Sequence, residues 1–573
     1  MKTLCCDIGS GSIRVAIIEY SPENVLKTKP LSIAIRPLKI YNRKTDFYEQ
    51  KTSEIWTAFQ QCTSECLEKS GLSFVSNISA FTIDAIAFSA TCSLVIVDGT
   101  NVKNDECDVI MWMDHRAKHE ASIINQSKNE VLTQFGGVCS PEFSLSKLYW
   151  LYRNDKSRFD SANAFMELSD WITYRCSQYY GSPEKFPRSL CCVTCKWGYD
   201  ANHHKWREDL FNQLGITWNQ SLEDRIGRSV INPGIRVSSL SVETAKDIGF
   251  IIKDDTKSDI IESVSIASSL IDAHAGAVSM LVFGNQLDGA IDTDRLKIDQ
   301  FENVFCMISG TSTCHMILNQ VRTPTKGVWG PYLDAIIPGY YLREAGQSAT
   351  GKLVEQVINS HFNGKLPKPI STIISDLNEQ LKLNDFNHRN SLIVNPTFHG
   401  NRSPIANPLL KGAIYGLTLE ATTLLDLYVA TVEAIAYETR FIVEEIEKNS
   451  QPIKKIIVTG GLTKNDLYLQ LHADILNTEL VTFSAGEADL MLVGASVIAF
   501  TGSLINDDKD RNKLTQLLQN LRADSNGFAE HVRTFQPRTN HKEYHQNKYQ
   551  CYRRLLDCCL EMETTLSNVS NEI

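Results

Sequence analysis

Two short turns of glycine, serine and threonine have the composition of phosphate-binding sites. Residues 9–12 (GSGS) and 310–313 (GTST) each lie between two apolar stretches that are typical of strands. Glycine lets backbone N–H groups approach a phosphate closely, and the hydroxyl groups add further donors. Because the two turns begin the two halves of the chain, we interpret them as a duplication, although two hairpins can resemble each other by chance.

Asp7 could add a metal site to the first turn. It ends a predicted buried strand directly before that turn, whereas Ile308 stands at the corresponding position before the second. A carboxylate at such a place can hold Mg²⁺ directly or through a water molecule. An Asx turn that opens the hairpin explains the same residue equally well, so both interpretations stay open.

Asp272 could serve as a general base. It follows the apolar segment SLI and precedes AHAGAVSML, where a helix is predicted. An aspartate at such a junction commonly caps the helix. It could also face a cleft near a domain boundary and accept a proton from a substrate hydroxyl. His274, two residues later, is more often structural than catalytic.

Two further glycine motifs have simple interpretations. The segment 454–465 (KKIIVTGGLTKN) predicts a strand, a Gly460-Gly461 turn and a helix that begins near Asn465. A flat ring could lie against these glycines, and a tight turn is the simpler alternative. Residues 344–353 (EAGQSATGKL) match seven of the eight positions of a P-loop. Leu353 replaces the hydroxyl residue that binds Mg²⁺, so we reject a P-loop.

The cysteine cluster CCVTC (191–195) raises the question of zinc. Cys192 and Cys195 form a C-x-x-C pair, and His203 and His204 follow. Zinc sites usually contain two ligand pairs with defined spacing, whereas here the two histidines are adjacent. We therefore favour buried thiols in a strand.

The elements that must position these residues alternate between strand and helix, which predicts an α/β protein. Residues 53–69 have a helical period of apolar residues, and residues 80–99 predict two strands that end in an Asp-Gly turn. We predict a first domain over 1–283, a linker over 284–303, a second domain over 304–505 and a helical extension over 506–573.

Composition excludes several functional classes. The chain has 573 residues and a net charge of −10, which argues against a general binder of nucleic acid or anionic membranes. Its longest apolar runs are shorter than a membrane span, and MKTLCCDIGSG does not have the apolar core of a signal peptide. Sixteen cysteines without a secretion signal indicate reduced thiols and a cytoplasmic location.

Taken together, the motifs resemble those of the FGGY carbohydrate kinase family, and most closely its D-ribulokinase-type members. The resemblance covers roughly residues 3 to 505 and its motifs occur in family order. The matching segments are DIGSGSIR (7–14), MWMDHRA (111–117), GGVCSPEFSLSKLYWL (136–151), IDAHAG (271–276), SGTSTCHM (309–316), REAGQSATGKL (343–353), FHGNRSP (398–404) and GGLTKN (460–465).

The resemblance implies two actin-like, ribonuclease-H-like domains with a cleft between them, and it implies ATP and Mg²⁺ as cofactors. Asp272 is then the general base, and Asp7 and Asp272 are the metal residues. Glu344 is expected to end a strand and point at the sugar, and Lys352 to be solvated. The implied nucleotide contacts are Gly9, Ser10, Gly11, Ser12, Arg14, Gly310, Thr311, Ser312, Gly460, Gly461 and Asn465, and the implied sugar contacts are Trp112, Lys196 and Glu344, with Asp114 and Arg116 supporting them.

The function implied by the resemblance is transfer of phosphate from ATP to the terminal hydroxyl of a ketopentose, with D-ribulose converted to D-ribulose 5-phosphate. Two alternatives stay open. One is a kinase of another sugar or polyol, such as L-ribulose, xylulose or glycerol, and the other is a regulator that binds nucleotide or sugar without catalysis. The sequence is compatible with a homodimer but does not determine the oligomeric state.

Overall fold

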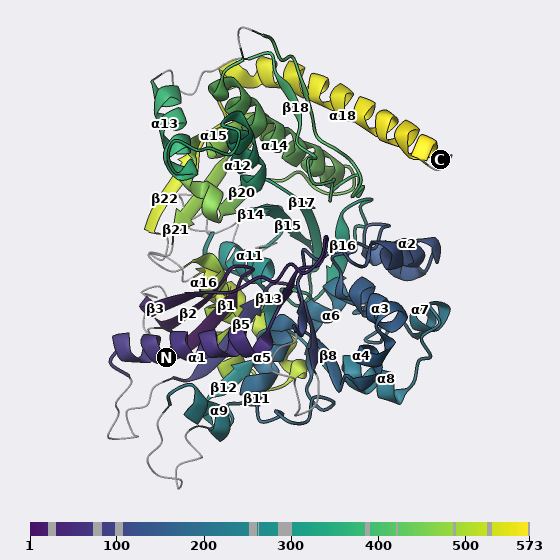
Figure 1. Ribbon diagram of the computed structural model, residues 1–573. Helices are drawn as coiled ribbons and strands as arrows, with labels where there is room; N and C mark the ends of the chain where they lie inside the picture. The colour runs from purple at the N-terminus through teal and green to yellow at the C-terminus, as the bar shows by residue number, and fades with distance from the viewer. Residues whose placement is uncertain are drawn as a thin grey trace.

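The computed structural model describes residues 1–20, 30–72, 83–97, 107–250, 261, 263–284, 301–383, 390–419, 422–484, 489–523 and 530–570. These residues form two lobes, each built on a mixed sheet that is flanked by helices (Figure 1). Most of the predicted linker 284–303 and the Asp-Gly turn at 98–99 lie outside the described residues.

The first sheet contains the first glycine turn. Its path is β11 (Arg236–Ser239), β12 (Ser265–Ala267), β5 (Ala85–Ala90), β1 (Lys2–Ile8), β2 (Ser12–Glu19) and β3 (Pro30–Pro37), with β13 (Leu270–Ile271) also paired to β5. Side chains alternate across β1, so Leu4 and Cys6 pack with the helices α1 (Thr52–Lys69) and α5 (Leu168–Cys176), whereas Cys5 faces the other side. The helix predicted over 53–69 is thereby confirmed as α1.

The second sheet repeats the first. Its order is β16 (Trp329–Leu333), β17 (Tyr341–Gln347), β15 (Thr313–Asn319), β14 (Val304–Ser309), β20 (Lys455–Thr459), β21 (Leu480–Ser484) and β22 (Glu530–Phe535). β17-β15-β14-β20-β21 has the strand directions of β3-β2-β1-β5-β12. Asp7 is paired with Ser89 of β5, and Ile308 is paired with Thr459 of β20. Asp7 and Ile308 thus occupy similar places in their sheets, but the two hairpins differ by one residue, because Asp7 pairs with Arg14 across the first turn and Ile308 with Cys314 across the second.

Two helices pack against each other between the two sheets. α16 (Leu490–Leu504) packs on β1, β5 and β12 of the first sheet, and α11 (Asp272–Phe283) packs on β14 of the second (Figure 1). The two helices approach so closely that a Cβ added at Gly494 of α16 would lie 1.8 Å from the carbonyl oxygen of Ala275 of α11. α16 belongs by sequence to the second predicted domain, yet it covers the sheet of the first.

The remaining elements surround these sheets. A four-stranded sheet, β4-β7-β6-β8, and the pairs β9-β10 and β18-β19 complete the strands of the described residues. Their bounds are β4 (Glu49–Gln50), β6 (Leu94–Val97), β7 (Val109–Ile110), β8 (Ala164–Glu167), β9 (Arg188–Ser189), β10 (Val230–Ile231), β18 (Ile393–Asn395) and β19 (Ala413–Tyr415). The other helices are α2 (Lys118–Gln126), α3 (Ser144–Asn154), α4 (Lys156–Ser161), α6 (Leu190–Lys196), α7 (Glu208–Gln213), α8 (Gln220–Ile226), α9 (Val242–Asp247), α12 (Gly351–His361), α13 (Ile370–Lys382), α14 (Leu424–Glu447) and α15 (Asp466–Leu476).

The sequence predicts a helical extension after residue 505, and this prediction is only partly correct. The segment contains α17 (Arg511–Ala523), which packs on α11, and β22, which pairs with β21 at the edge of the second sheet. The last helix, α18 (Lys542–Ser570), runs over the outside of the second lobe and contacts β18 and α15 (Figure 1). None of the described helices is long and apolar enough to cross a membrane.

We predict that Gly494→Ala destabilises the protein by at least about 2 kcal/mol, because the new methyl group meets the backbone of α11 and cannot be accommodated by a side-chain rotation. In a helix without this contact the same change would stabilise by roughly 1 kcal/mol. Urea unfolding measures the difference, with Ser503→Ala on the same helix as the control. A Gly494→Ala variant as stable as the wild type would show that the two helices are not in close contact.

Candidate active site

The two glycine turns have similar internal bonds and accessible tips. Gly9 N–H donates to Ser12 O at 2.9 Å, and Gly310 N–H donates to Ser312 O, also at 2.9 Å. Gly11 and Thr311 are exposed, and among the described residues no atom would lie within 4 Å of a Cβ added at Gly11. Both tips are thus accessible to an anion, as phosphate binding requires.

Asp7 is buried near the end of β1, with an exposed fraction of 2%. Its Oδ1 accepts a hydrogen bond of 2.8 Å from Ser89, and Arg14 Nη1 lies 3.7 Å from its Oδ2. Burial raises the pKa of this carboxyl group, while Arg14 opposes the increase. Arg14 also pairs with Asp489, which caps α16. Arg14, a predicted nucleotide contact, therefore already has two carboxylate partners.

Asp272 is the first residue of α11, and Ile271 occupies the N-cap position without a side-chain cap bond. The Asp272 carboxylate does accept a hydrogen bond of 2.7 Å from the adjacent Ala273 N–H. Burial, and next the negative charge of Asp7, raise the pKa of Asp272 to about 7. Two carboxyl groups thus share one region and disfavour each other's ionisation, an arrangement that a divalent cation would relieve.

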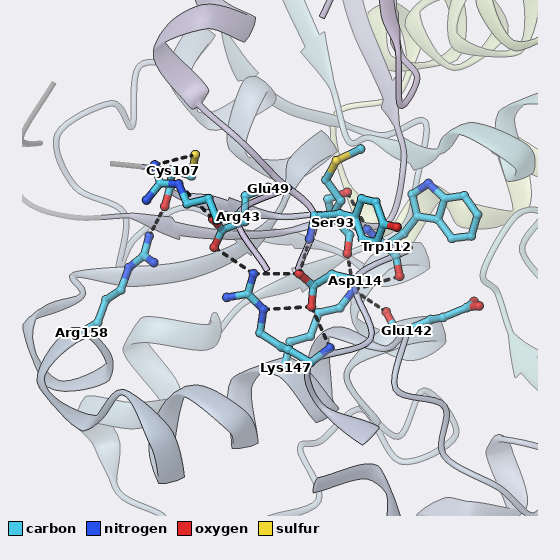
Figure 2. A network of polar contacts seen from close by, with 12 residues as sticks. Arg43, Glu49, Ser93, Cys107, Trp112, Asp114, Glu142, Lys147 and Arg158 are labelled. Atoms are coloured by element: carbon cyan, nitrogen blue, oxygen red, sulfur yellow. Dashed lines mark hydrogen bonds and ion pairs between the residues drawn. The ribbon is translucent and has the colours of Figure 1, made fainter. Parts of the chain in front are cut away.

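Trp112 connects the predicted sugar residues to the first turn. Its indole Nε1 donates to Ser10 Oγ at 2.8 Å. Its backbone N–H donates to Ser93 Oγ at 3.2 Å, and its carbonyl oxygen accepts from Lys147 Nζ at 3.2 Å (Figure 2). Lys147 is fully buried and also donates to the carbonyl of Glu142 at 2.9 Å. The Lys147 ammonium therefore fixes the segment that carries the indole.

Asp114 and Arg116 lie beneath Trp112 as a buried ion pair. The Arg116 guanidinium donates to both Asp114 oxygens, at 2.9 and 2.7 Å, and to Glu49 at 2.8 Å. The exposed fraction is 0% for the Asp114 side chain and 3% for that of Arg116. Both groups are occupied by each other, which fits the supporting role expected for them rather than direct sugar contact.

Lys196 and Glu344 meet across the two lobes. Lys196 Nζ lies 3.2 Å from Glu344 Oε2 and 4.5 Å from the ring centre of Trp329. Burial opposes the ionisation of Glu344, but Lys196 and His274 together outweigh it and lower the pKa of this carboxyl to about 2. Glu344 lies in the middle of β17, opposite Met316, so the expectation that it ends a strand is wrong. The strand continues beyond Glu344 because β15 stays paired with residues 345–347, whereas the pairing with β16 ends at Glu344.

Arg402 and Glu142 are site residues that sequence reasoning missed. Arg402 Nη2 lies 3.2 Å from Glu142, and its guanidinium lies 5.6 Å from the ring of Trp112 and 5.5 Å from that of Trp329. Both residues fall within the matching segments FHGNRSP and GGVCSPEF, which was the available signal. Their pairing across the lobes depends on tertiary structure and has no local signature.

The Cys314 thiol shows that these groups surround one region. Burial raises its pKa to about 12, and the charges of four residues also act on it. The four are Arg402, Glu344, Asp272 and Lys196. Asp272 and two of the predicted sugar contacts, Lys196 and Glu344, therefore lie within electrostatic reach of the same thiol.

The predicted adenosine region is built around Gly460. Its φ is 98°, and an added Cβ would lie 2.4 Å from Ser309 O, at the end of the strand that leads into the second turn. Gly461 beside it is exposed. Asn465 caps α15 by accepting from Tyr468 N–H at 3.3 Å, and its Nδ2 donates to Tyr428 at 2.8 Å. Asn465 thus positions this loop through its own hydrogen bonds.

Two other sequence motifs have structural explanations. Lys352 is solvated on α12, as expected, and pairs with Glu355 at 2.9 Å. The CCVTC segment is buried as expected, but it forms the helix α6 rather than a strand. His203 has a 70% exposed side chain and pairs with Asp200, so it does not join the cysteines.

Comparison with known proteins identifies the relatives of this chain. Residues 3–229 match the N-terminal domain, and residues 306–503 the C-terminal domain, of the FGGY family of carbohydrate kinases. An FGGY carbohydrate kinase domain-containing protein of Homo sapiens is 33% identical over 580 residues, covering 96% of this chain and 95% of that protein. A D-ribulokinase of Saccharomyces cerevisiae is 28% identical over 523 residues, covering 83% and 68%.

Among solved structures, a glycerol kinase of Plasmodium falciparum with ADP superposes with a TM-score of 0.71. The sequences are 16% identical, and the superposition covers 97% of this chain and 98% of that one. The two mixed α/β domains therefore have the actin-like fold of sugar kinases. The chain belongs to the FGGY family of carbohydrate kinases.

We predict that Lys196→Met destabilises the protein by about 3–5 kcal/mol, because the Glu344 carboxylate would stay buried without its partner. The double variant Lys196→Met/Glu344→Gln should recover part of this loss. Lys352→Met is the control, and its exposed pair should change stability by no more than about 0.5 kcal/mol. Equal effects of Lys196→Met and Lys352→Met in urea unfolding would contradict the buried pair.

Proposed function

We propose that this carbohydrate kinase transfers the γ-phosphoryl group of ATP to the terminal hydroxyl of a ketopentose, and that D-ribulose is converted to D-ribulose 5-phosphate. The observation that carries the proposal is Asp272, a half-buried carboxylate at the start of α11 that lies within the electrostatic reach of Asp7 and Lys196 and whose charge acts on Cys314. The identity of the sugar is supported by the D-ribulokinase of Saccharomyces cerevisiae among the relatives.

The glycine turns and the Gly460 loop would hold the nucleotide. The exposed tips at Gly11 and Thr311 offer backbone N–H groups to phosphates, and the exposed Gly461 offers a flat surface to the adenine ring. The paired carboxyl groups of Asp7 and Asp272, both with raised pKa, fit a Mg²⁺ ion. When bound, Mg²⁺ neutralises charge on the transferred phosphoryl group.

The chain's own residues then handle the sugar. Trp112, Arg402 and the Lys196–Glu344 pair would bind its hydroxyl groups and hold the terminal one near Asp272. The Asp272 carboxylate accepts the proton of that hydroxyl. At the same time the hydroxyl oxygen forms a bond to the γ-phosphorus, and the bond between the γ-phosphorus and the oxygen of the leaving ADP breaks. Positioning supplies most of the rate enhancement, because phosphoryl transfer requires little covalent chemistry from the protein.

We predict that Asp272→Asn lowers turnover by about 10²–10⁴-fold, the usual contribution of a positioned general base. The fold should be unchanged, because Asn keeps the oxygen that accepts from Ala273 N–H. Steady-state kinetics measures the loss, and calorimetry with ATP serves as the binding control. An Asn variant that retains more than about a third of wild-type turnover would falsify the assignment of Asp272 as the base.

The pH dependence of the wild type provides a second measurement on the same residue. With a pKa raised to about 7, Asp272 is protonated in acid and cannot accept the proton. We expect kcat/KM for the sugar to fall as the pH decreases, with a midpoint at or below about 7, because a bound cation lowers the pKa. A rate that is constant from neutral pH down to about pH 4 would contradict this role.

The substrate is tested by ADP release over a panel of pentoses, pentitols and trioses. D-ribulose should give the highest specificity constant, because a site built to bond hydroxyl groups rejects analogues that lack them by large factors. A clearly higher value for L-ribulose, xylulose or glycerol would reassign the sugar while keeping the kinase. ADP release with no member of the panel, combined with tight nucleotide binding, would favour a regulator without catalysis.

A further inference from the structure

Two cysteines and a histidine form a compact cluster beneath the candidate sugar site. Cys191 and Cys195 lie one turn apart on α6, and His274 comes from the first turn of α11. Cys191 Sγ is 2.9 Å from His274 Nδ1, and the three potential ligand atoms lie within 4.8 Å of one another. All three side chains are fully buried. The helical form of α6 creates the cluster, because residues four apart share a helix face.

Cys192 does not belong to the cluster, although the sequence pairs it with Cys195. Its Sγ contacts Ser169 Oγ at 3.2 Å. The buried thiol of Cys192 therefore contacts Ser169, whereas the buried thiols of Cys191 and Cys195 lie beside His274. Cys192 is therefore a matched control for any property of the cluster.

The histidine is oriented as a metal ligand. Glu344 Oε2 lies 3.3 Å from His274 Nε2 and 3.2 Å from Lys196 Nζ. A carboxylate held by an ammonium group accepts hydrogen bonds, so Nε2 carries the hydrogen and Nδ1 presents its lone pair toward Cys191. Histidines that bind metals almost always donate their second ring N–H to a carboxylate or carbonyl in this way.

We propose that Cys191, Cys195 and His274 form a binding site for a thiophilic divalent cation of the Zn²⁺ class, with Glu344 as the carboxylate that orients His274. Donors at about 2.3 Å for sulfur and 2.0–2.1 Å for nitrogen around one ion are separated by about 3.5 Å, which small side-chain shifts can supply here. Three protein ligands leave a fourth position on the ion.

The charges balance when the cation binds. Each thiol loses its proton, so binding releases two protons and the two thiolates neutralise the dication. No net charge is then placed in the buried cluster, which avoids the large cost of an unpaired buried ion. Because all three donors are fully buried, we expect the cation to enter while the chain folds.

The test measures zinc in the full-length chain produced in zinc-supplemented medium and freed of loose metal by gel filtration. Elemental analysis should find about one zinc per chain in the wild type and in Cys192→Ser, and less than about a tenth of that in Cys191→Ser and Cys195→Ser. Glu344→Gln should weaken zinc retention against a chelator by about 10–100-fold. A wild type without zinc, or cysteine variants that keep it, would overturn the proposal.

X-ray absorption at the zinc edge keeps the test decisive if the cysteine variants do not fold, because it needs only the wild type. The expected shell has two sulfur atoms at about 2.3 Å and a nitrogen at about 2.0–2.1 Å. A shell of oxygen or nitrogen alone would overturn the proposal. Neither measurement uses activity, so a failure here is independent of the proposed sugar kinase function.

Discussion

The close approach of α11 and α16 is the constraint on which the rest of the architecture depends. The absence of a side chain at Gly494 lets α16 lie directly on the backbone of α11 at Ala275. One helix covers the first sheet and the other contacts the second, so this crossing connects the two lobes. Because Asp272 is the first residue of α11, the crossing also sets the position of the candidate base.

Charge pairs between the lobes define the surroundings of that base. Lys196 meets Glu344, and Glu142 meets Arg402, each pair joining residues that are distant in sequence. Buried ion pairs seldom add much net stability, because desolvation offsets the attraction between the charges. We infer that these pairs fix the orientation of polar groups toward a sugar. Asp7 and Asp272 belong to neither pair, and the charge of Asp7 disfavours the ionisation of Asp272.

Much of the fold could be predicted from the sequence where local patterns suffice. The two strand–turn–strand units at residues 7–18 and 308–318 were predictable, because pairing across a tight turn is a short-range property, although the second turn is one residue shorter than the first. The α16 helix on the first sheet, and β22 on the second, depend on long-range pairing that no local pattern contains. A short apolar run such as CCVTC suits a strand or a helix, which explains the wrong prediction for α6. In the site, the pairing of Glu142 with Arg402 could not be predicted, because it joins two segments that meet only through the contact between the lobes.

The most direct test of this account is a crystal structure with D-ribulose and a non-hydrolysable ATP analogue. The account predicts that the terminal hydroxyl of the sugar lies about 2.6–3.2 Å from an Asp272 carboxylate oxygen, on the side that faces the γ-phosphate. It also predicts sugar contacts to Trp112 and the Lys196–Glu344 pair. A sugar whose terminal hydroxyl lies beyond hydrogen-bond reach of Asp272, or faces a different carboxylate, would contradict it.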